Sequence, residues 1–293
     1  HKENVVLRKP RSVSALGVGL ALLVVGPLAA VQQQVPLPPR STTGRTVTPA
    51  FEGWYPNEDG TYSMSFGYYN RNSEEIIEIP VGSDNMLEPA SLVQNQPTRF
   101  EEGRHWGTFA VQVPATFGDQ EITWTLKMKG ETFMVPGHLH PDWRIDALRE
   151  GAHGNMPPVL QFERDGPEIV GPGASGFVLG PLHTSVGEPV EISLYANDTG
   201  GGRSLGGFGG GGGRNRTLAT LTWFKHSGPG DVTFAEASHR VRDADVAAVN
   251  SVTFGAPGEY VIRIRATDSS GVSGAGHAQC CWSNGFVAVS VSP

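Results

Sequence analysis

Alternation of large apolar residues with small or polar ones is the feature that most constrains the fold of this chain. The run YSMSFGYYN, residues 62–70, places Tyr62, Met64, Phe66 and Tyr68 at every second position. This period of two puts the four large side chains on one face of an extended strand. The preceding Asp-Gly pair tolerates the positive φ angles of a tight turn, so a hairpin is expected there.

Similar runs recur along residues 50–140, and no stretch of this region has a helical period. The alternating sets are Ile77-Ile79-Val81, Phe109-Val111-Val113, Ile122-Trp124-Leu126-Met128 and Phe133-Val135. Several short strands separated by turn residues are typical of an antiparallel β-sandwich. We therefore predict an N-terminal β-sandwich over residues 50–140, followed by a connector over residues 141–158.

A second set of strands follows in residues 159–293. They are Val190-Ile192-Leu194-Ala196, Leu221-Trp223, Val232-Phe234, Val252-Phe254, Tyr260-Ile262-Ile264-Ala266 and Val287-Val289-Val291. In the fifth of these, Arg263 and Arg265 occupy the opposite face, which predicts one buried and one solvated sheet face. This region too reads as a β-sandwich.

The first thirty residues have the three parts of a secretory signal peptide. A basic start precedes an apolar run from Val13 to Val25 and a small-residue exit at Leu28-Ala29-Ala30. Export is therefore expected, to the periplasm, cell surface or extracellular space, with membrane contact only through this peptide. A retained anchor is the alternative, although Pro27 breaks the apolar stretch. Residues 31–49, rich in Pro, Thr and Gln, read as a linker.

The charge balance argues against two classes of partner. The chain has 22 Lys and Arg against 29 Asp and Glu. Removing residues 1–30, which hold four basic residues and one acidic one, leaves a net charge of −10. A surface this acidic argues against nucleic acid and against anionic membranes.

A glycine-rich segment, residues 200–216, interrupts the second region. Ten of the fourteen residues from Gly200 to Gly213 are glycine. A phosphate-binding loop would precede a helix, whereas a strand follows here. We therefore interpret the segment as a long hairpin loop.

The motifs TWFKHSGPGDVTF and VTFGAPGEYVIRIRATDSSG resemble the PKD and immunoglobulin-like modules of bacterial exported proteins. The resemblance rests on Trp223, the SGPG turn, Pro257-Gly258, Tyr260 and Asp268 and covers about 110 residues. Structural reasons accompany it: Trp223 fills the space between the sheets, and Tyr260 suits a corner hydrogen bond. The resemblance implies a fold and no reaction.

The N-terminal region is similar to a β-sandwich module of uncharacterised bacterial exported and cell-surface proteins. The shared features are FGYYNRN, IPVGSDN, NQPTRF and WTL, although Asn95 stands where that module has Gly. Together the two regions look like a two-module exported protein. The expected fold class is all-β, with two tandem immunoglobulin-like antiparallel β-sandwiches.

A metal site is one functional hypothesis. The sequence PGHLHPDW supplies His138, His140 and Asp142, and an H-x-H pair on a strand places both rings on one face. Zn²⁺ or Cu²⁺ would need a third ligand from elsewhere, such as His105 or His153. Ordinary turn residues are the alternative.

Calcium is a further metal hypothesis, because acidic and amide residues cluster in turns and β-sandwich loops often hold this ion. The clusters are Asn57-Glu58-Asp59, Asn70 and Asn72, Asp84-Asn85, Asn197-Asp198, and Asp243 and Asp245. None has the spacing of a calcium loop. Turn formation through hydrogen bonds to their own backbone explains the clusters equally well. No cofactor is therefore assigned.

Catalysis has little support, because no G-x-S-x-G elbow and no H-E-x-x-H motif is present. Exposed aromatic residues are the better lead, since such rings stack on sugars or fill a partner's pocket. The candidates are Trp54, Tyr55, Tyr69 and Trp282, with Trp106 and Trp143 also in loop-like context. The alternative is that these rings close the ends of the cores.

We therefore predict a non-enzymatic binding or architectural module of the bacterial cell envelope or extracellular space. Its partner would be a polysaccharide or a cell-surface protein. Metal binding through His138 and His140 is the alternative function.

The two cysteines of the chain are adjacent, Cys280 and Cys281. In an exported protein the only intramolecular disulfide available joins these neighbours. Two free thiols or an intermolecular link are the alternatives. We expect a vicinal disulfide that stiffens the loop carrying Trp282 and makes Cys280-Cys281-Trp282 an apolar contact patch.

Overall fold

The computed structural model describes residues 41–91, 95–146, 155–173, 178–198, 217–269, 271–275 and 278–293. The predicted signal peptide, the start of the linker, the glycine-rich segment and His153 lie outside these residues. All described residues belong to one compact unit, Arg40–Pro293. Among them, no helix is both long and apolar enough to cross a membrane.

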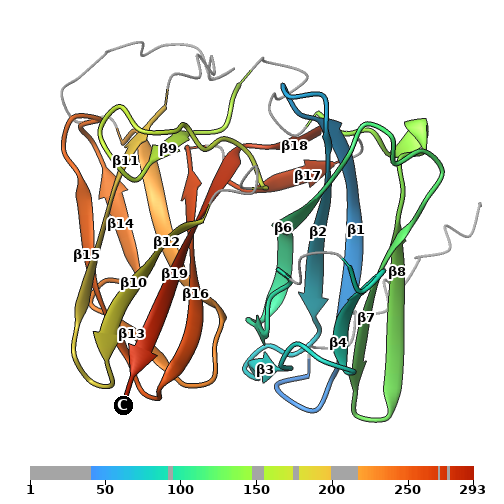
Figure 1. Cartoon of the computed structure of the whole chain (residues 1–293), viewed down its shortest axis with the longest axis horizontal. Helices are drawn as coiled ribbons and strands as arrows, with labels where there is room; N and C mark the ends of the chain where they lie inside the picture. Colours follow the sequence, from blue (N-terminus) through green and yellow to red (C-terminus); the bar gives the residue numbers. More distant parts are fainter. Residues whose placement is uncertain are drawn as a thin grey trace, which may run out of the picture. The chain divides into compact units, whose positions relative to one another are not determined.

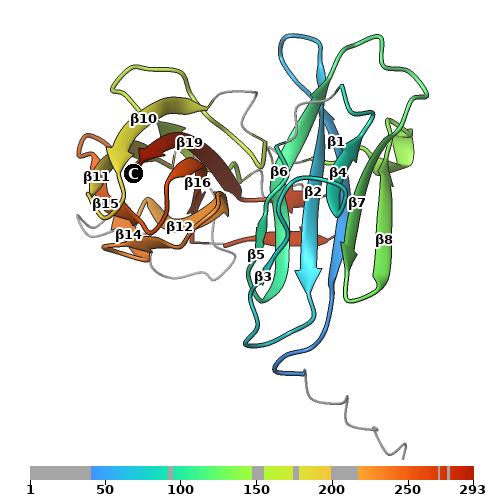
Figure 2. The same cartoon turned by 60° about the horizontal axis from the view of Figure 1, so that its bottom comes forward.

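The predicted fold class is confirmed: the described chain is all-β and forms two tandem immunoglobulin-like sandwiches (Figure 1). Eight strands build the first. They are β1 (Val47–Pro56), β2 (Tyr62–Asn70), β3 (Ile77–Glu78), β4 (Asn85–Glu88), β5 (Arg99–Phe100), β6 (Gly103–Val113), β7 (Ile122–Met128) and β8 (Glu131–Gly137). The sheet β1-β2-β6 faces the sheet β4-β7-β8, and β3 pairs with β5 (Figure 2).

The alternating residues of these strands form the first core, as their period of two predicts. Met64, Phe66 and Tyr68 are buried with Trp124 of β7. The indole Nε1 of Trp124 donates a hydrogen bond of 3.0 Å to the buried Asn85 Oδ1. Asn85 was one of the calcium candidates, and its side chain instead satisfies buried polar groups of the core.

The first sandwich differs from the expected one at two points. Regular structure starts at Val47 and not at residue 50, and residues 41–46 already bond to residues 70–75, as in the 3.0 Å bond from Ser73 N to Ser41 O. The strand expected at 77–81 is only two residues long, since Pro80 has no N–H to continue a ladder.

Eleven strands build the second sandwich. They are β9 (Val159–Gln161), β10 (Leu179–Ser185), β11 (Val190–Asn197), β12 (Ala219–Ser227), β13 (Val232–Phe234), β14 (Ser238–Val241), β15 (Ala248–Phe254), β16 (Gly258–Thr267), β17 (Ser273–Ala275), β18 (Ala278–Cys280) and β19 (Trp282–Ser292). The sheet β10-β19-β16-β12-β14 faces the sheet β13-β15-β11-β9, and β17 pairs with β18.

One pairing departs from the antiparallel expectation, because β10 runs parallel to β19. Strands β9, β10, β14, β17 and β18 were not predicted. Each is short or lacks alternating apolar residues: β10 contains Pro181, and three of the four residues of β14 are polar or charged.

The residues that carry the resemblance have the structural roles expected of them. Trp223 is buried in the second core. The Tyr260 hydroxyl donates to the carbonyl of Ala256 at 2.8 Å and accepts from the N–H of Gly230 at 2.9 Å. This hydrogen-bonded corner fixes the two turns that contain Pro229 and Pro257.

The prediction of a solvated face on β16 is wrong. Arg263 is only 3% exposed, and Arg265 is half-buried. The first sandwich covers this face: the His105 ring of β6 lies 6.1 Å from the Phe224 ring of β12. The alternation of residues along a strand shows which side chains share a face. It does not show that another sandwich packs on that face and buries it.

Candidate functional site

The most exposed aromatic residue of the described chain lies against a β-bulge in β1. The register of β1 against β2 shifts between Phe51 and Gly53, and Gly53 has a φ of +121°. A Cβ at Gly53 would lie 2.4 Å from the carbonyl oxygen of Trp143. The bulge glycine therefore lets the segment after β8 lie directly on β1.

That segment is the single-turn 3₁₀-helix η1 (Pro141–Trp143), the light green coil beside β8 in Figure 1. Trp54 holds it at two points. Its indole Nε1 donates to the carbonyl of His140 at 2.8 Å, and its own carbonyl accepts from the N–H of Ile145 at 2.9 Å. The turn is thus fixed to a strand of the core.

Trp143 is presented to solvent by this turn. Trp143 is 45% exposed. The other exposed large hydrophobic residues of the described chain are valines and methionines. One part of the ring packs on Phe51, at 5.4 Å between ring centroids, and His138 lies perpendicular to it at 6.0 Å. Trp143 therefore combines a fixed position with an open surface.

Polar side chains neighbour Trp143 along this turn. His140, directly before η1, and Asp142 are exposed, with 3.5 Å between His140 Nδ1 and Asp142 Oδ2. The Arg144 guanidinium lies 5.9 Å from the Trp54 ring centroid. We call the set Trp54, His138, His140, Asp142, Trp143 and Arg144 the η1 surface. It combines one exposed aromatic ring with side chains that can form hydrogen bonds.

The histidine pair belongs to this surface but differs from the predicted geometry. His138 and His140 lie beyond the end of β8, and their rings are perpendicular, with centroids 6.1 Å apart. His138 Nδ1 accepts the N–H of His140 at 3.3 Å, and His140 Nδ1 accepts the N–H of Asp142 at 3.3 Å. Within the described ranges, no three His, Cys, Asp or Glu side chains are close enough to hold a metal ion.

The remaining predicted aromatics do not join the η1 surface. Tyr55 is 5% exposed, and its hydroxyl accepts from the N–H of Gly173 at 3.2 Å; burial raises the pKa of this phenol. Tyr69 is half-buried near the far end of β2, five residues beyond the register partner of Trp54, or roughly 16 Å along the strand.

The predicted patch at Cys280-Cys281-Trp282 is half confirmed. The vicinal disulfide is present, between β18 and β19. The three side chains are nevertheless buried, with Trp282 at 0% exposure, so they form no contact surface. Trp282 packs against Gly107 of β6 and donates to its carbonyl at 3.4 Å. The cover again comes from the first sandwich, which local sequence does not reveal.

Strand β6 makes the junction between the sandwiches at Gly107. The Nδ2 of Asn284, on β19, donates to the carbonyls of Gly107 at 2.8 Å and Pro172 at 2.7 Å. A Cβ on Gly107 would lie 2.7 Å from both Pro172 and Trp282. Glycine at this position allows the close approach, and Trp106 beside it lies on β6 and not in a loop.

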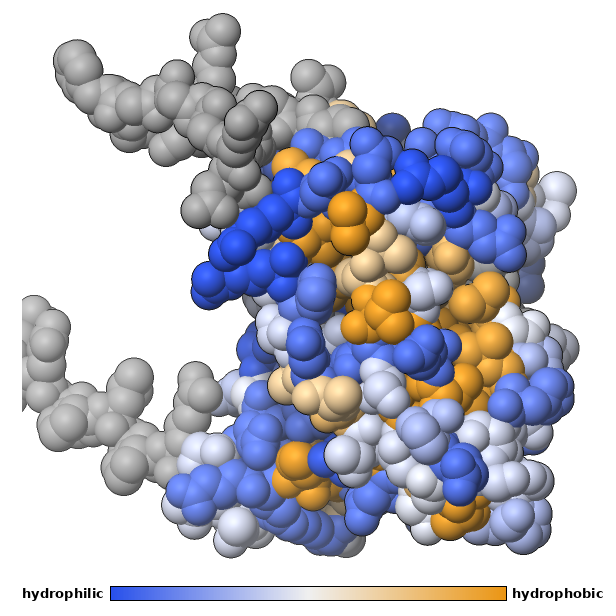
Figure 3. All heavy atoms as spheres, turned by 90° about the vertical axis from the view of Figure 1, so that its left-hand side faces the viewer, coloured by the Kyte–Doolittle hydropathy of each residue, from blue (hydrophilic) through white to orange (hydrophobic). Residues whose placement is uncertain are grey.

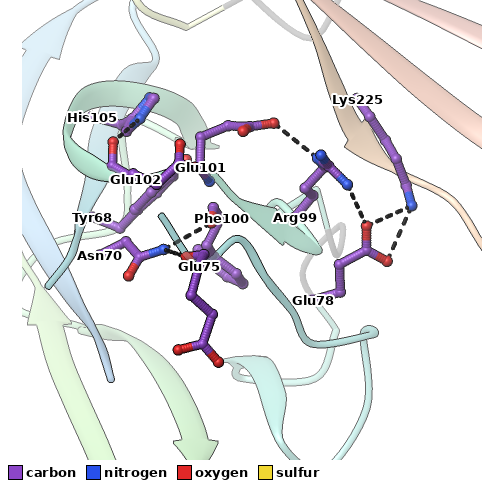
Figure 4. A network of polar contacts seen from close by, with 10 residues as sticks. All are labelled: Tyr68, Asn70, Glu75, Glu78, Arg99, Phe100, Glu101, Glu102, His105 and Lys225. Atoms are coloured by element: carbon purple, nitrogen blue, oxygen red, sulfur yellow. Dashed lines mark hydrogen bonds and ion pairs between the residues drawn. The ribbon is translucent and has the colours of Figure 1, made fainter. Parts of the chain in front are cut away.

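A second part of the junction is ionic (Figure 4). The Lys225 Nζ, on β12, lies 3.0 Å from Glu78 Oε1 of the first sandwich, and the Lys225 side chain is only 3% exposed. Glu78 also pairs with Arg99 at 2.8 Å, and Arg99 pairs with Glu101 at 2.8 Å. The N–H of Thr98 donates to the carbonyl of His226 at 2.8 Å. Backbone and side-chain bonds thus join the sandwiches.

Burial shifts the pKa values of several groups near the junction. Burial and the nearby Arg263 lower the pKa of His226 to about 3. Burial, with Arg263, Arg265 and Arg104, lowers the pKa of His105 to about 3. Burial raises the pKa of Glu52 to about 7, although Arg104 Nη2 lies 2.6 Å from its Oε1. Perturbed pKa values often mark active sites, but these groups are enclosed between the sandwiches and serve packing.

In two of the acidic turns proposed as calcium candidates, the Asp side chain bonds to the backbone of its own turn. Asp59 Oδ1 accepts from the N–H of Thr61 at 3.0 Å, and Asp243 Oδ1 accepts from the N–H of Asp245 at 2.9 Å. These bonds are the local side-chain to backbone bonds that Asp forms in turns.

Comparison with known proteins gives structural similarity only. No protein-family model matches the chain, and no curated protein matches it by sequence. Solved structures similar to it include domains 4 and 5 of the S-layer protein SbsC (11% identity, 73% of this chain, 79% of that one, TM-score 0.24) and the D00-D0 domain of intimin (8%, 83%, 99%, 0.26). The titin tandem A164-A165 is another (9%, 85%, 99%, 0.22). Values this low support no conclusion about family or function.

Of the residues on the η1 surface, the sequence pointed to Trp54, His138, His140 and Asp142 as site residues and to Trp143 only as a ring in loop-like context. Pro and Asp directly after His140 indicate a turn there, but not that the following ring is exposed. Arg263 and Arg265 were missed as junction residues for the reason given above.

Proposed function

We propose that this protein is a non-catalytic binding and architectural module, and that its first sandwich binds polysaccharide through the η1 surface. The observation that carries the proposal is Trp143, an indole 45% exposed on a turn that Trp54 fixes to β1. A fixed aromatic ring loses little side-chain entropy when a ligand stacks on it. The N–H and O–H groups of a sugar would meet His140, Asp142 and Arg144 around the ring.

The net charge of the protein indicates which class of polysaccharide it would bind. The chain without residues 1–30 has a net charge of −10, and the η1 surface itself carries the exposed Asp142 beside a single arginine. Acidic polymers would be repelled over most of such a surface. A neutral polysaccharide is therefore the ligand class that we propose.

The rest of the exposed apolar surface suits this ligand less well. The second sandwich exposes Val178, Val186, Val246 and Val249. The side of the molecule seen in Figure 3 carries apolar areas broken by hydrophilic ones. Aliphatic side chains lack the flat π face on which a sugar ring stacks.

The architectural part of the proposal rests on the junction. The Lys225–Glu78 pair and the bonds of Asn284 to the first sandwich join two cores. A spacer built this way would hold the η1 surface at a fixed orientation on the envelope or outside the cell. Export through the signal peptide of residues 1–30, and a cell-surface protein as a second partner, are parts of this proposal.

Isothermal titration calorimetry against neutral and acidic oligosaccharides tests the proposal. We expect binding of a neutral oligosaccharide and a loss of at least tenfold in affinity for Trp143→Ala. Val246→Ala, which removes an exposed side chain from the second sandwich, is the matched control and should bind normally. Equal binding by Trp143→Ala, or no binding of any glycan, would contradict the proposal.

Metal binding through His138 and His140 remains the alternative function. Zinc and copper titrations of wild type and His138→Ala decide it. A stoichiometric site lost in His138→Ala would favour the metal hypothesis, with a ligand from outside the described residues completing the site. The glycan titration repeated with a chelator separates the two functions.

A further inference from the structure

Two arginines of β16 share one aromatic ring at the junction. Arg263 and Arg265 lie on the same face of the strand, and Phe224 of β12 is the register partner of Arg263. The guanidinium carbon of Arg263 is 4.3 Å from the Phe224 ring centroid, and that of Arg265 is 5.1 Å from it. The ring thus brings two like charges together.

Neither guanidinium forms an ion pair with a described carboxylate. Arg263 donates one hydrogen bond, from Nη1 to Asn284 Oδ1 at 3.2 Å. The Nε atoms of Arg263 and Arg265 are buried without a hydrogen-bond partner. Two N–H donors near one ring therefore lack acceptors.

Three carboxylates on the junction side of the first sandwich pair with other cations. Glu101 pairs with Arg99, Glu78 with Arg99 and Lys225, and Glu52 with Arg104. Glu101 and Tyr68 act on Arg263 only as part of its electrostatic surroundings. Burial and the repulsion from Arg265 lower the pKa of Arg263 to about 9, and a guanidinium group stays protonated at neutral pH.

Buried charge without a counterion is strongly unfavourable, and each buried N–H without an acceptor adds to the cost. The cation–π contacts with Phe224 offset part of it. One acceptor of negative charge would satisfy both Nε–H groups and neutralise one of the two charges. A neutral water molecule would satisfy the donors but leave the repulsion.

We propose that a small monovalent anion of the size of chloride binds at the junction between the two sandwiches, where the Nε–H groups of Arg263 and Arg265 beside Phe224 both donate to it. The enclosed setting favours a monatomic ion over a carboxylate or phosphate. Because this anion lies between β16 and the first sandwich, its binding would stabilise the junction and not the η1 surface. The inference is thus independent of the proposed glycan binding.

Thermal unfolding at fixed ionic strength tests the proposal, with sodium chloride exchanged for sodium gluconate, whose anion is too large to enter. We expect a saturable rise in Tm with chloride, roughly 5 °C at a hundredfold excess over Kd. Arg265→Met keeps an apolar stem beside Phe224 and should lose the rise. Arg240→Met, at an exposed position of β14, removes the same charge and should keep it.

Equal Tm values in chloride and gluconate would overturn the proposal, as would an unchanged chloride effect in Arg265→Met. If that variant does not fold, bromide provides a direct test on the wild-type protein. Crystals soaked in sodium bromide should show an anomalous peak within hydrogen-bond distance of both Nε atoms. No peak at that place would overturn the site, and peaks confined to the outer surface would mean an adventitious ion only.

Discussion

Buried histidines at the junction make the stability of the folded protein sensitive to acid. His226 is 3% exposed, and its Nε2 lies 2.8 Å from the carbonyl of Asn95. Its pKa of about 3 lies below the ordinary value of 6.5, because burial and Arg263 disfavour the charged ring. In the unfolded chain this histidine binds a proton at higher pH than in the folded chain.

The sign of the resulting pH dependence follows. The stability contributed by neutral His226 is fully present above pH 6.5 and is lost as the pH falls from 6.5 towards 3, at up to about 1.4 kcal/mol per pH unit. His226→Gln keeps a donor to Asn95 without the charge, so we expect a flatter decline between pH 6.5 and 4 in chemical denaturation. His183→Gln, exposed on β10, is the control and should follow the wild type.

Glu52 changes the stability with pH in the opposite direction to His226, over an overlapping pH range. Its folded pKa of about 7 is above the ordinary value of 4.5, so its contribution to stability is present below pH 4.5 and is lost as the pH rises to 7. The acid decline should therefore be steeper in Glu52→Gln than in the wild type. A decline that is unchanged or shallower would contradict the raised pKa of this carboxyl.

The Tyr260 corner gives a further test with a single oxygen atom. Tyr260→Phe removes one hydrogen bond to Ala256 and leaves the N–H of Gly230 without an acceptor. We expect a loss of about 1–2 kcal/mol in the free energy of unfolding, measured by urea denaturation. A loss below about 0.5 kcal/mol would show that water replaces the hydroxyl at this corner.

At the scale of elements, β6 depends on Gly107. This residue has a φ of +43°, and a Cβ there would lie 2.7 Å from the side chains of both Pro172 and Trp282. Gly107→Ala should lower the free energy of unfolding by about 2–4 kcal/mol, the sum of backbone strain and overpacking.

Gly60→Ala separates these two causes. Gly60 also has a positive φ, +81°, but nothing lies within 4 Å of its Cβ position. We therefore expect only the backbone part there, about 1 kcal/mol. Equal losses in the two variants would contradict the close packing of Gly107 against the second sandwich.

Local periodicity predicts the strands that have one apolar face and fails where the burial is not local. Tyr62 to Tyr68, Ile122 to Met128 and Tyr260 to Ala266 alternate strictly, and each run lies in a strand of the expected core. Strand β10, with Pro181 and a parallel partner, has no such pattern. Turn chemistry indicates a turn near Trp143, but its attachment to the bulge at Gly53 depends on residues ninety positions apart.

Burial of Arg263 and of Trp282 could not be predicted for the same reason. An arginine is ordinarily exposed, and the sequence does not show that the first sandwich packs on Arg263 and Trp282. The disulfide was predictable, because two neighbouring cysteines leave a single intramolecular pairing.

At the scale of the whole molecule, the junction predicts that the two sandwiches unfold together. It contains the nearly buried Lys225, its partner Glu78, and the bonds of Asn284 to Gly107. Differential scanning calorimetry should give one transition with equal calorimetric and van't Hoff enthalpies. Two resolved transitions would show that the sandwiches are thermodynamically independent.

The architectural proposal needs this coupling, whereas glycan binding needs only the first sandwich. A protein with two transitions and intact glycan binding would therefore keep the η1 surface and lose the role of the second sandwich as a rigid support. The two parts of the proposed function can thus fail separately.

Binding of a neutral polysaccharide by Trp143 is tested most directly by ¹H–¹⁵N NMR. The spectra follow the indole N–H of Trp143 during titration with a neutral oligosaccharide. Trp282, buried with 0% exposure, provides an internal control in the same spectra. We predict a saturable shift of the Trp143 resonance with a shift of Trp54 beside it and none of Trp282. Unchanged Trp143 and Trp54 resonances at saturating concentrations of an oligosaccharide that binds the protein would contradict the account.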